Sequence, residues 1–271
     1  MGIVFHKSEF IKREDVVIQT SNRAFNYGDG FFETIKIINA KPFNFSTHYL
    51  RYCFSCEILQ LNIQHTEESF LSIINKLIER NNIKNGSAKI HISRSGGGKY
   101  LPHYASSEIV INVNNGDGFI LNKPISLCFF KEEVKTKGKL SNIKSSNALV
   151  SVLAAIYAQE RGFDNTILLN TDGNIIETTN SNIFIVKNGQ IVTPPISEGC
   201  VDGTMRKWVL EQVNVIEKPL TVIDIQEANE VFTSNAIDGI TPVAAIKETK
   251  QYDTIIAKRL QEKLISLSLG F

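Results

Sequence analysis

One lysine of the chain lies where a lysine side chain can become a nucleophile. Lys144 directly precedes the polar residues 145–147 (Ser-Ser-Asn), which can cap the apolar stretch after them. An ammonium group beside a helix N-terminus meets the positive end of the helix dipole, which favours the neutral amine. A neutral lysine amine forms Schiff bases with carbonyl compounds. Lys144 is therefore a candidate catalytic residue, although a solvated, charged lysine is the commoner occupant of such a position.

Two further features could complete a site around such a lysine. Residues 203–206 (Gly-Thr-Met-Arg) stand where a loop is expected to turn into a helix, and free backbone N–H groups there can bind a phosphate. Glu177 ends a β-like run, and a buried carboxylate there would need a cationic or protonated partner. Each feature also has a simpler structural explanation. Together, a lysine, a carboxylate and an anion site are the groups that a pyridoxal phosphate enzyme uses.

Motifs of other enzyme classes are missing from the sequence. It contains no GxSxG, HExxH or GxxxxGK[ST] motif, and no GxGxxG lies between an expected strand and helix. Cys53 and Cys56 form a CxxC pair, but no second pair or histidine cluster completes four ligands. We therefore expect no metal site.

The candidate site residues must be positioned by a mixture of short strands and helices. The expected strands of the first part cover residues 31–38, 89–93 and 109–113. One expected helix covers residues 67–80. Another is capped by Ser46 or Thr47 and ends at Leu59. In the second part, a helix is expected to begin after Asn147 and to end before Gly162. A second helix is expected to begin near Met205, and a third to cover residues 253–267. Asp-Gly at 172–173 and Asn-Gly at 188–189 predict hairpins.

The densest cluster of turn-forming residues, residues 114–118 (NNGDG), predicts a linker. We expect a smaller N-terminal α/β domain over residues 1–116 and a larger C-terminal domain over residues 117–271 that carries Lys144. The predicted fold class is α/β with mixed sheets, and a cleft between the two lobes is the expected site.

Composition narrows the possible classes of protein. The 271 residues are 42% hydrophobic and 21% charged, which excludes disorder, fibrous repeats and coiled coil. Lys+Arg 29 against Asp+Glu 28 gives a net charge of +1, so neither nucleic acid nor an anionic membrane is an expected partner. No apolar run is long enough to span a bilayer, and no secretory signal is evident. With only four cysteines, we expect a cytoplasmic protein.

Several motifs, taken in order, resemble the fold-type IV pyridoxal phosphate enzymes of the class IV aminotransferase family. This family includes branched-chain aminotransferase, D-amino acid aminotransferase and aminodeoxychorismate lyase, and the similarity covers nearly the whole chain. The motifs are Arg23 with residues 27–34 (YGDGFFET), residues 48–51 (HYLR), 143–147 (IKSSN), Glu177 with 181–184 (SNIF), 193–195 (TPP) and 203–206 (GTMR).

The resemblance implies a two-domain fold like that of D-amino acid aminotransferase, a homodimer and pyridoxal 5'-phosphate as cofactor. Lys144 would bond the cofactor and move the substrate proton, Glu177 would pair with the pyridine nitrogen, and Arg51 would bind the phosphate. The other implied cofactor contacts are Val201, Thr204, Met205, Asn235 and Ala236.

Within this family the sequence looks most like aminodeoxychorismate lyase. Ala148 and Leu149 stand where branched-chain enzymes carry a tyrosine, and the loop after Arg94 lacks the Arg-x-His pair of the D-amino acid enzymes. The lyase would release pyruvate and 4-aminobenzoate, a folate precursor, from its small amino substrate. The implied substrate-binding residues are Phe32, Lys36, Arg94 and Lys99, and Phe31 and residues 95–103 are candidates to shape the pocket.

Two other functions stay open. An aminotransferase acting on branched-chain or D-amino acids would share every cofactor residue and differ only in the steps after proton removal. A binding protein without catalysis would have little physical reason to keep Lys144, Glu177 and Arg51 together.

Overall fold

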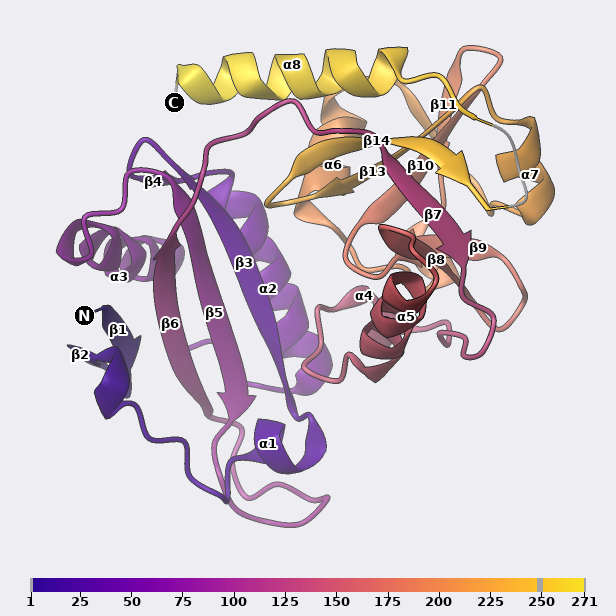
Figure 1. The fold of residues 1–271 in the computed structure, drawn as a ribbon. Helices are drawn as coiled ribbons and strands as arrows, with labels where there is room; N and C mark the ends of the chain where they lie inside the picture. The colour runs from indigo at the N-terminus through magenta and orange to yellow at the C-terminus, as the bar shows by residue number, and fades with distance from the viewer. Residues whose placement is uncertain (1, 248–250, 271) are drawn as a thin grey trace. The chain divides into compact units, whose positions relative to one another are not determined.

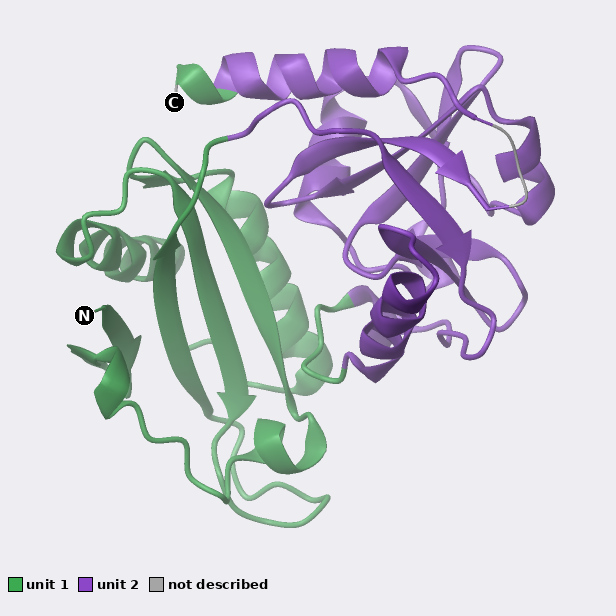
Figure 2. Ribbon diagram, viewed as in Figure 1, with its two compact units in different colours: residues 1–118, 143–147, 268–271 green, residues 119–142, 148–267 purple. Residues whose placement is uncertain are grey.

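The computed structural model describes residues 2–247 and 251–270, and the chain forms two units (Figures 1 and 2). Unit 1 comprises residues 1–118, 143–147 and 268–271, and unit 2 comprises residues 119–142 and 148–267. Each unit combines a sheet with helices. The predicted fold class, α/β with mixed sheets, is confirmed.

Unit 1 contains a six-stranded antiparallel sheet in the order β2-β1-β6-β5-β3-β4. The strands are β1 (Ile3–His6), β2 (Glu9–Lys12), β3 (Gly30–Ile38), β4 (Lys41–Pro42), β5 (Gly86–Arg94) and β6 (Ser107–Asn115). The helices are α1 (Arg23–Tyr27), α2 (Phe45–Leu59), α3 (Glu67–Arg80) and the short 3-10 helix Arg13–Asp15. The three strands predicted in this part are confirmed, whereas the hairpin of β1 and β2 was not anticipated.

Alternate residues of β3 point to opposite faces of the unit 1 sheet: one face is apolar and packs on the helices, and the other carries polar side chains. Phe31, Ile35 and Ile37 are almost fully buried and form a core cluster with Tyr52 of α2 and Leu77 of α3. Because successive strand residues point to opposite faces, the residues between them face away from these helices. That second face contains several of the predicted substrate residues.

The two long helices of unit 1 begin in different ways. Thr66 caps α3 by accepting a hydrogen bond from the Ser69 amide, so the predicted range is confirmed. By contrast, α2 begins one residue before Ser46, after Asn44 in a left-handed conformation. The prediction that Ser46 or Thr47 caps this helix is wrong, because the Thr47 hydroxyl instead donates to the Asn44 side chain at 2.8 Å.

Unit 2 contains an eight-stranded mixed sheet in the order β12-β11-β10-β13-β14-β7-β8-β9. Its strands are β7 (Ile125–Phe129), β8 (Asn165–Leu169), β9 (Ile175–Thr178), β10 (Asn182–Lys187), β11 (Gln190–Thr193), β12 (Val215–Glu217), β13 (Glu230–Asn235) and β14 (Gly239–Ile246). Its helices are α4 (Lys139–Asn142), α5 (Leu149–Glu160), α6 (Thr204–Gln212), α7 (Val222–Glu227), α8 (Ile255–Leu269), which ends in unit 1, and the 3-10 helix Ile196–Glu198.

A further pairing between β9 and β10 closes part of this sheet on itself, with Glu177 opposite Asn182.

The turns between neighbouring strands form where the sequence predicts them. Asn188 and Gly189 both have positive φ and join β10 to β11, as a type I′ turn requires, and Gly173 turns β8 into β9. The hairpin predictions are therefore confirmed. No helix in the described part of the chain has the length and apolar character needed to cross a membrane.

The short segment that carries Lys144 belongs to unit 1, although we expected it in the C-terminal domain. The Phe32 amide donates to the Lys144 carbonyl at 3.0 Å, and the Ser146 amide donates to the Gly30 carbonyl at 3.0 Å. These bonds extend the sheet beside the start of β3, since β4 pairs only with Ile37 and Ile38 at its end, and they explain why residues 143–147 group with the first 118 residues.

Candidate active site

The Lys144 side chain is positioned by strand β3. Its backbone carbonyl accepts the Phe32 amide, and its ammonium nitrogen lies 4.7 Å from the centroid of the Phe32 ring. The ring shields one side of the ammonium group from water and attracts a cation through its π face. Backbone pairing and an aromatic ring therefore fix the lysine, rather than a helix.

Lys144 does not lie at a helix N-terminus, so that prediction is wrong. Helix α5 begins at Leu149, and its N-cap is Ala148, which has no capping side chain. Ser145 accepts a hydrogen bond from the Asn147 amide at 3.1 Å, so residues 145–147 form a local turn instead of a cap. Because the dipole effect falls off within the first turn of a helix, it does not reach Lys144.

Three charged or titratable side chains meet in the core of unit 1. Glu33 of β3 accepts hydrogen bonds from Arg51 Nε at 2.7 Å and Arg51 Nη2 at 2.6 Å, and lies 2.7 Å from His48 Nδ1. All three residues are at most 4% exposed. The HxxR spacing places His48 and Arg51 one turn apart on the same face of α2, so a single carboxylate can bind both.

Burial and charge act in opposite directions on this cluster. Burial raises the pKa of Glu33, but the Arg51 charge and the hydrogen bonds from His48 and Arg51 outweigh it and lower this pKa to about 2. Burial lowers the pKa of His48. At neutral pH the cluster therefore contains an ionised carboxylate, a guanidinium and a neutral imidazole. Arg51 is thus held in one orientation by Glu33.

The face of the unit 1 sheet opposite its helices carries the predicted substrate residues Phe32 and Lys36. It also carries Lys89, which stands opposite Thr34 in the register of β3 and β5. The Lys89 ammonium lies 5.2 Å from the centroid of the Phe32 ring, the ring that Lys144 also contacts. We did not single out Lys89 from the sequence. The alternating pattern of β5, aligned with β3, is the signal that could have identified it.

Other predicted substrate residues have structural contacts. Arg94 donates to Asp29 Oδ2 at 2.9 Å and to the carbonyls of Leu59 and Gln60. These contacts hold its side chain inside unit 1 and argue against a role in substrate binding. The Lys99 side chain is exposed. Phe31 is fully buried 5.9 Å from the Tyr52 ring, so the expectation that it shapes the pocket is not supported.

The loop after β5 is held by Arg23, which is 3% exposed. Its guanidinium donates to Asp29 and to the carbonyls of Gly97, Gly98 and Lys99. One buried arginine thus replaces the regular pairing that an irregular loop lacks. Arg23 was a marker of the family motif, and this is its structural basis.

Glu177 of β9 has the partner that burial requires. It is 5% exposed, forms an ion pair with Lys135, and accepts the Val201 amide at 2.9 Å. Lys135 is one of several lysines in residues 131–144. Its ammonium group meets Glu177 because a buried carboxylate needs a cation.

The loop before α6, for which the sequence predicts an anion site, lies within unit 2. A Cβ atom on Gly203 would lie 1.9 Å from Asn182 Oδ1, so a larger residue would displace the Asn182 side chain from its bond to the Val201 carbonyl. Thr204 and Met205, both buried, follow as the first helical residues. Ser234 stands opposite Asn182 in the pairing of β10 and β13, and its hydroxyl is buried without a hydrogen bond to any described residue. An anion at this helix start would satisfy such a group.

In the turn after β13, both polar groups of the Asn235 side chain are hydrogen-bonded within the protein. Its amide donates to Ser181 and Asp238, and its carbonyl oxygen accepts the Ile237 and Asp238 amides. A cofactor contact at Asn235 or Ala236 is therefore left to the backbone.

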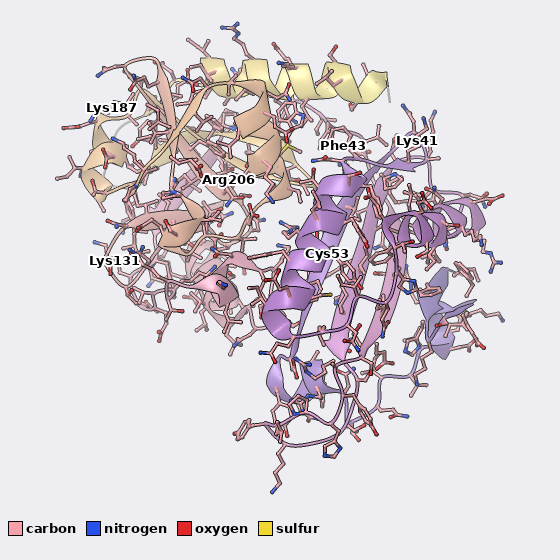
Figure 3. The ribbon with its side chains drawn as sticks, turned by 180° about the vertical axis from the view of Figure 1, so that it is seen from behind. Lys41, Phe43, Cys53, Lys131, Lys187 and Arg206 are labelled. Atoms are coloured by element: carbon pink, nitrogen blue, oxygen red, sulfur yellow. The ribbon has the colours of Figure 1, made fainter. Side chains whose placement is uncertain are left out.

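The two cysteines of the CxxC pair are free thiols on α2, where Figure 3 labels Cys53. Among the residues that the structure describes, no three histidine, cysteine or acidic side chains gather as metal ligands.

A family model decides the relationship of this chain to known proteins. The amino-transferase class IV model matches residues 30–246, which include both the Lys144 segment and the loop before α6. The chain belongs to the class IV aminotransferase family. Enzymes of this family use pyridoxal phosphate.

Individual members of the class IV family are similar over nearly their full length. The chain is 29% identical to a putative branched-chain-amino-acid aminotransferase of Methanocaldococcus jannaschii, covering 96% of this chain and 94% of that protein. It is 27% identical to D-alanine aminotransferase of Staphylococcus haemolyticus, covering 91% and 89%.

Solved structures of class IV enzymes confirm the predicted fold-type IV architecture. Branched-chain aminotransferase of Thermoproteus uzoniensis has a TM-score of 0.92 at 22% identity, covering 99% of this chain and 95% of that one. A putative 4-amino-4-deoxychorismate lyase of Legionella pneumophila has a TM-score of 0.85 at 24% identity, covering 94% and 97%. These likenesses concern the fold alone.

The Glu33 cluster yields a stability prediction. Replacing Glu33 by Gln (Glu33→Gln) removes the negative charge that Glu33 places beside the buried Arg51 guanidinium, and we expect a loss of about 3–5 kcal/mol in the free energy of unfolding. Urea unfolding monitored by circular dichroism measures this. The exposed Glu57 on α2 provides a matched control, since Glu57→Gln should change stability by less than about 0.5 kcal/mol.

The same pair of proteins tests the direction of the pKa shift. Because the pKa of Glu33 is lowered from 4.5 to about 2, its stabilising contribution is present above pH 4.5 and disappears as the pH falls towards 2. The difference in stability between wild type and Glu33→Gln should therefore shrink over this range. A difference independent of pH would contradict an ionised Glu33.

The Lys135–Glu177 pair can be tested in the same way. Lys135→Met leaves the buried Glu177 carboxylate with only the Val201 amide, and we expect a stability loss of about 1–3 kcal/mol. Lys131, an exposed lysine of the same segment labelled in Figure 3, is the control. Equal effects of Lys135→Met and Lys131→Met would show that the pair contributes nothing.

Proposed function

We propose that this class IV enzyme is a pyridoxal phosphate-dependent lyase that converts 4-amino-4-deoxychorismate to pyruvate and 4-aminobenzoate. The observation that carries the proposal is the placement of Lys89 beside the Phe32 ring that Lys144 also contacts. No described carboxylate lies within ion-pair distance of Lys89. A half-buried, unpaired ammonium group is suited to binding a carboxylate of the substrate.

The spacing of the two lysines favours a carboxylate that is remote from the reacting carbon. Strand β5, with Lys89, and the segment with Lys144 flank β3 on opposite sides. Two strand spacings, about 10 Å, therefore separate their backbones. In aminodeoxychorismate the ring carboxylate lies across the ring from the carbon that bears the amine. In an amino acid the carboxylate is attached to the reacting carbon itself.

The proposal gives each cofactor-binding residue one role. We propose that Lys144 bonds the cofactor and that Arg51 binds its phosphate. Glu177 would accept the hydrogen bond of the ring nitrogen, and Val201 would pack on the ring. Backbone N–H groups of Thr204, Met205, Asn235 and Ala236 would bind the phosphate, which the close approach of Gly203 to Asn182 at the start of α6 supports.

The chemistry divides between the cofactor and the chain. Bound pyridoxal phosphate supplies the electron sink for the carbon that carries the substrate amine. Lys144 removes the proton from that carbon, and the electron pair of the broken C–H bond becomes the last double bond of the aromatic ring. The C–O bond to the enolpyruvyl group breaks with its electron pair on the oxygen, and the released enolpyruvate takes up a proton to become pyruvate. Lys89 holds the ring carboxylate, and Lys36, on the same face of β3, is placed for the second carboxylate.

An aminotransferase acting on branched-chain or D-amino acids is the second candidate. It is supported by the sequence relatives, which are aminotransferases aligned over more than nine tenths of this chain. It would use the same cofactor residues, with Lys144 again moving the proton of the substrate carbon, and no enolpyruvyl group would leave.

We also propose that the enzyme is a homodimer. Helix α5 exposes Leu149, Val152, Leu153 and Ile156 at 70%, 51%, 49% and 47%, and these residues share one face of the helix. A second copy of the chain, packing on this apolar face, would remove it from water. Light scattering of the purified protein measures the oligomeric state.

The first experiment separates the two candidate reactions. Holoenzyme is given aminodeoxychorismate prepared in situ, an L-amino acid or a D-amino acid, each without a 2-oxo acid. A lyase forms pyruvate and 4-aminobenzoate in equal amounts while the visible absorbance of the lysine-bound cofactor persists. Loss of that absorbance with an amino acid alone, without these products, would identify an aminotransferase and refute the lyase.

Removal of the proposed catalytic lysine should abolish turnover. We expect Lys144→Ala to lower the rate of 4-aminobenzoate formation by more than about 10³-fold, because both the covalent attachment and the proton acceptor are lost. Lys139 is an exposed lysine five residues earlier, and Lys139→Ala should retain the wild-type rate. Turnover in Lys144→Ala would refute the assignment.

Removal of the proposed carboxylate anchor should affect binding more than chemistry. Losing one charge-assisted hydrogen bond in Lys89→Gln is expected to raise KM for aminodeoxychorismate about 10- to 100-fold, with a smaller change in kcat. The exposed Lys84 before the same strand supplies the control Lys84→Gln. An unchanged KM in Lys89→Gln would exclude Lys89 from substrate binding. A fall in kcat of about 10- to 100-fold with an unchanged KM would instead place Lys89 in the chemical step.

A further inference from the structure

His91 of β5 stands in the same cross-strand row of unit 1 as the proposed catalytic lysine. Lys144 is paired with Phe32 on one side of β3, since the Phe32 amide donates to the Lys144 carbonyl. On the other side of β3, His91 is the register partner of Phe32. Directly opposed residues of antiparallel strands point to the same face of a sheet. The side chains of Lys144 and His91 therefore share one face, and their backbones are about 10 Å apart.

Both side chains border the Phe32 ring. The Lys144 ammonium nitrogen lies 4.7 Å from the centroid of this ring, and the centroid of the His91 ring lies 6.2 Å from it. The ammonium nitrogen of Lys89, the proposed carboxylate anchor, lies 5.2 Å from the same centroid. Lys89 precedes His91 by two residues on β5, so it points to the same face. A ligand that contacts both lysines therefore lies beside His91.

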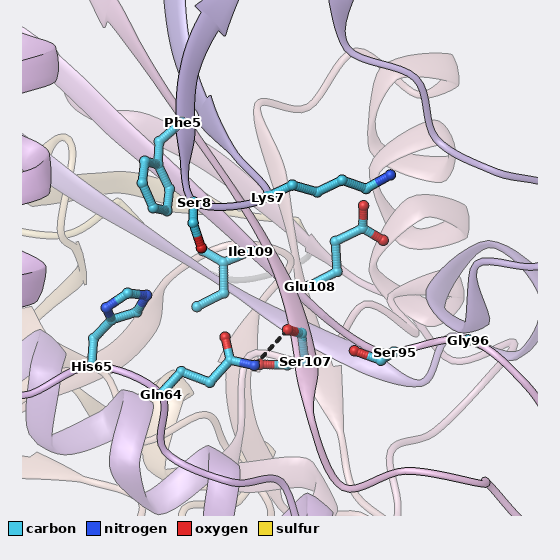
Figure 4. Close-up of a pocket in the computed structure, with 10 residues that line it drawn as sticks. All are labelled: Phe5, Lys7, Ser8, Gln64, His65, Ser95, Gly96, Ser107, Glu108 and Ile109. Atoms are coloured by element: carbon cyan, nitrogen blue, oxygen red, sulfur yellow. Dashed lines mark hydrogen bonds between the residues drawn. The ribbon is translucent and has the colours of Figure 1, made fainter.

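The His91 side chain is accessible to a ligand on this face. It is exposed, whereas its neighbours Ile90 and Ile92 are buried in the core cluster on the helix side of the sheet. Two residues of that cluster, Phe5 and Ile109, line the cavity drawn in Figure 4. Because His91 points to the opposite face, it belongs to the face of the proposed substrate residues.

The imidazole of His91 is neutral and has both nitrogen atoms available. Partial burial of the ring beside Phe32, together with the Lys89 charge, lowers its pKa, so the neutral form predominates at pH 7. Within residues 2–247 and 251–270, the ring forms no hydrogen bond or ion pair. A neutral imidazole offers one N–H donor and one acceptor nitrogen.

We propose that His91 donates a hydrogen bond to the oxygen of the departing enolpyruvyl group. This inference rests on the proposed lyase reaction. The oxygen is bonded to the ring carbon next to the one from which Lys144 removes the proton, so it belongs to the end of the substrate that reacts beside the Lys144–His91 row. The ring carboxylate extends away from this end towards Lys89, which stands in the next row of the same face.

The hydrogen bond acts on the step in which charge develops. As the C–O bond breaks, its electron pair moves onto the oxygen, and the N–H group of His91 stabilises the negative charge that forms there. His91 keeps its proton, and the released enolpyruvate takes a proton from water to become pyruvate. The oxygen carries little charge in the bound substrate, so the bond strengthens in the transition state. His91 is therefore expected to affect kcat more than KM.

The test compares two replacements of His91 in holoenzyme supplied with aminodeoxychorismate prepared in situ. His91→Phe keeps a ring beside Phe32 but removes the donor, and we expect kcat for 4-aminobenzoate formation to fall about 100-fold, with less than about a threefold change in KM. His91→Gln keeps an N–H donor and should stay within about tenfold of the wild-type kcat. The matched control is His65→Phe, which changes a half-buried histidine beside the rings of Phe5 and Phe70 and should keep the wild-type kcat.

Hydrogen exchange separates an effect on C–O cleavage from a structural effect. In deuterium oxide, the position from which Lys144 removes the proton can take up deuterium instead, and NMR of recovered substrate measures this exchange. Because His91→Phe slows C–O cleavage and leaves proton removal intact, it should raise the ratio of exchange to 4-aminobenzoate formation by about tenfold or more. Circular dichroism of each variant verifies that it is folded.

Several outcomes would refute the role of His91. An unchanged kcat in His91→Phe excludes the hydrogen bond, and equal losses of exchange and cleavage indicate a structural effect. A rise in KM at constant kcat would place His91 among the residues that only bind substrate. In each of these cases the wild type still forms 4-aminobenzoate, so the lyase assignment survives. A wild type that forms none refutes that assignment, and the role of His91 with it.

Discussion

The arrangement of unit 1 depends on the backbone pairing between residues 144–146 and the start of β3. Two hydrogen bonds place Lys144 beside Phe32 and make a short, irregular segment part of a rigid sheet. The same strand presents Glu33 to α2 on its other face, since neighbouring strand residues point in opposite directions. One strand thus positions the candidate catalytic lysine, the carboxylate that orients Arg51 and the ring that two lysines share.

The sequence was most informative where the physics is local. Turn chemistry identified the hairpins at Gly173 and Asn188, and apolar spacing identified α3, because these depend on neighbouring residues alone. Motif resemblance found the family, which the match over residues 30–246 establishes. The local prediction failed for Lys144, since the helix expected to begin beside it begins at Leu149.

Contacts between distant residues could not be predicted from the sequence. Lys135 is one of a run of lysines, and nothing local distinguishes the one that meets Glu177, 42 positions further along. Lys89 becomes relevant only through its register with β3. Arg94 matched a substrate residue by motif, but its bonds to Asp29 and to the α2 terminus are set by tertiary packing. In each case the partner of a charged group decided its role.

The closure of the unit 2 sheet has a geometric consequence. Glu177 stands opposite Asn182 across the β9–β10 pair, Asn182 donates to the Val201 carbonyl at 2.8 Å, and the Val201 amide donates to Glu177. The acid and the glycine turn before α6 are therefore joined through one short ring of bonds, and their separation cannot vary independently. Unit 2 therefore holds a carboxylate and a helix N-terminus at a fixed spacing, and a rigid ligand that contacts both has to match that spacing in its own covalent frame.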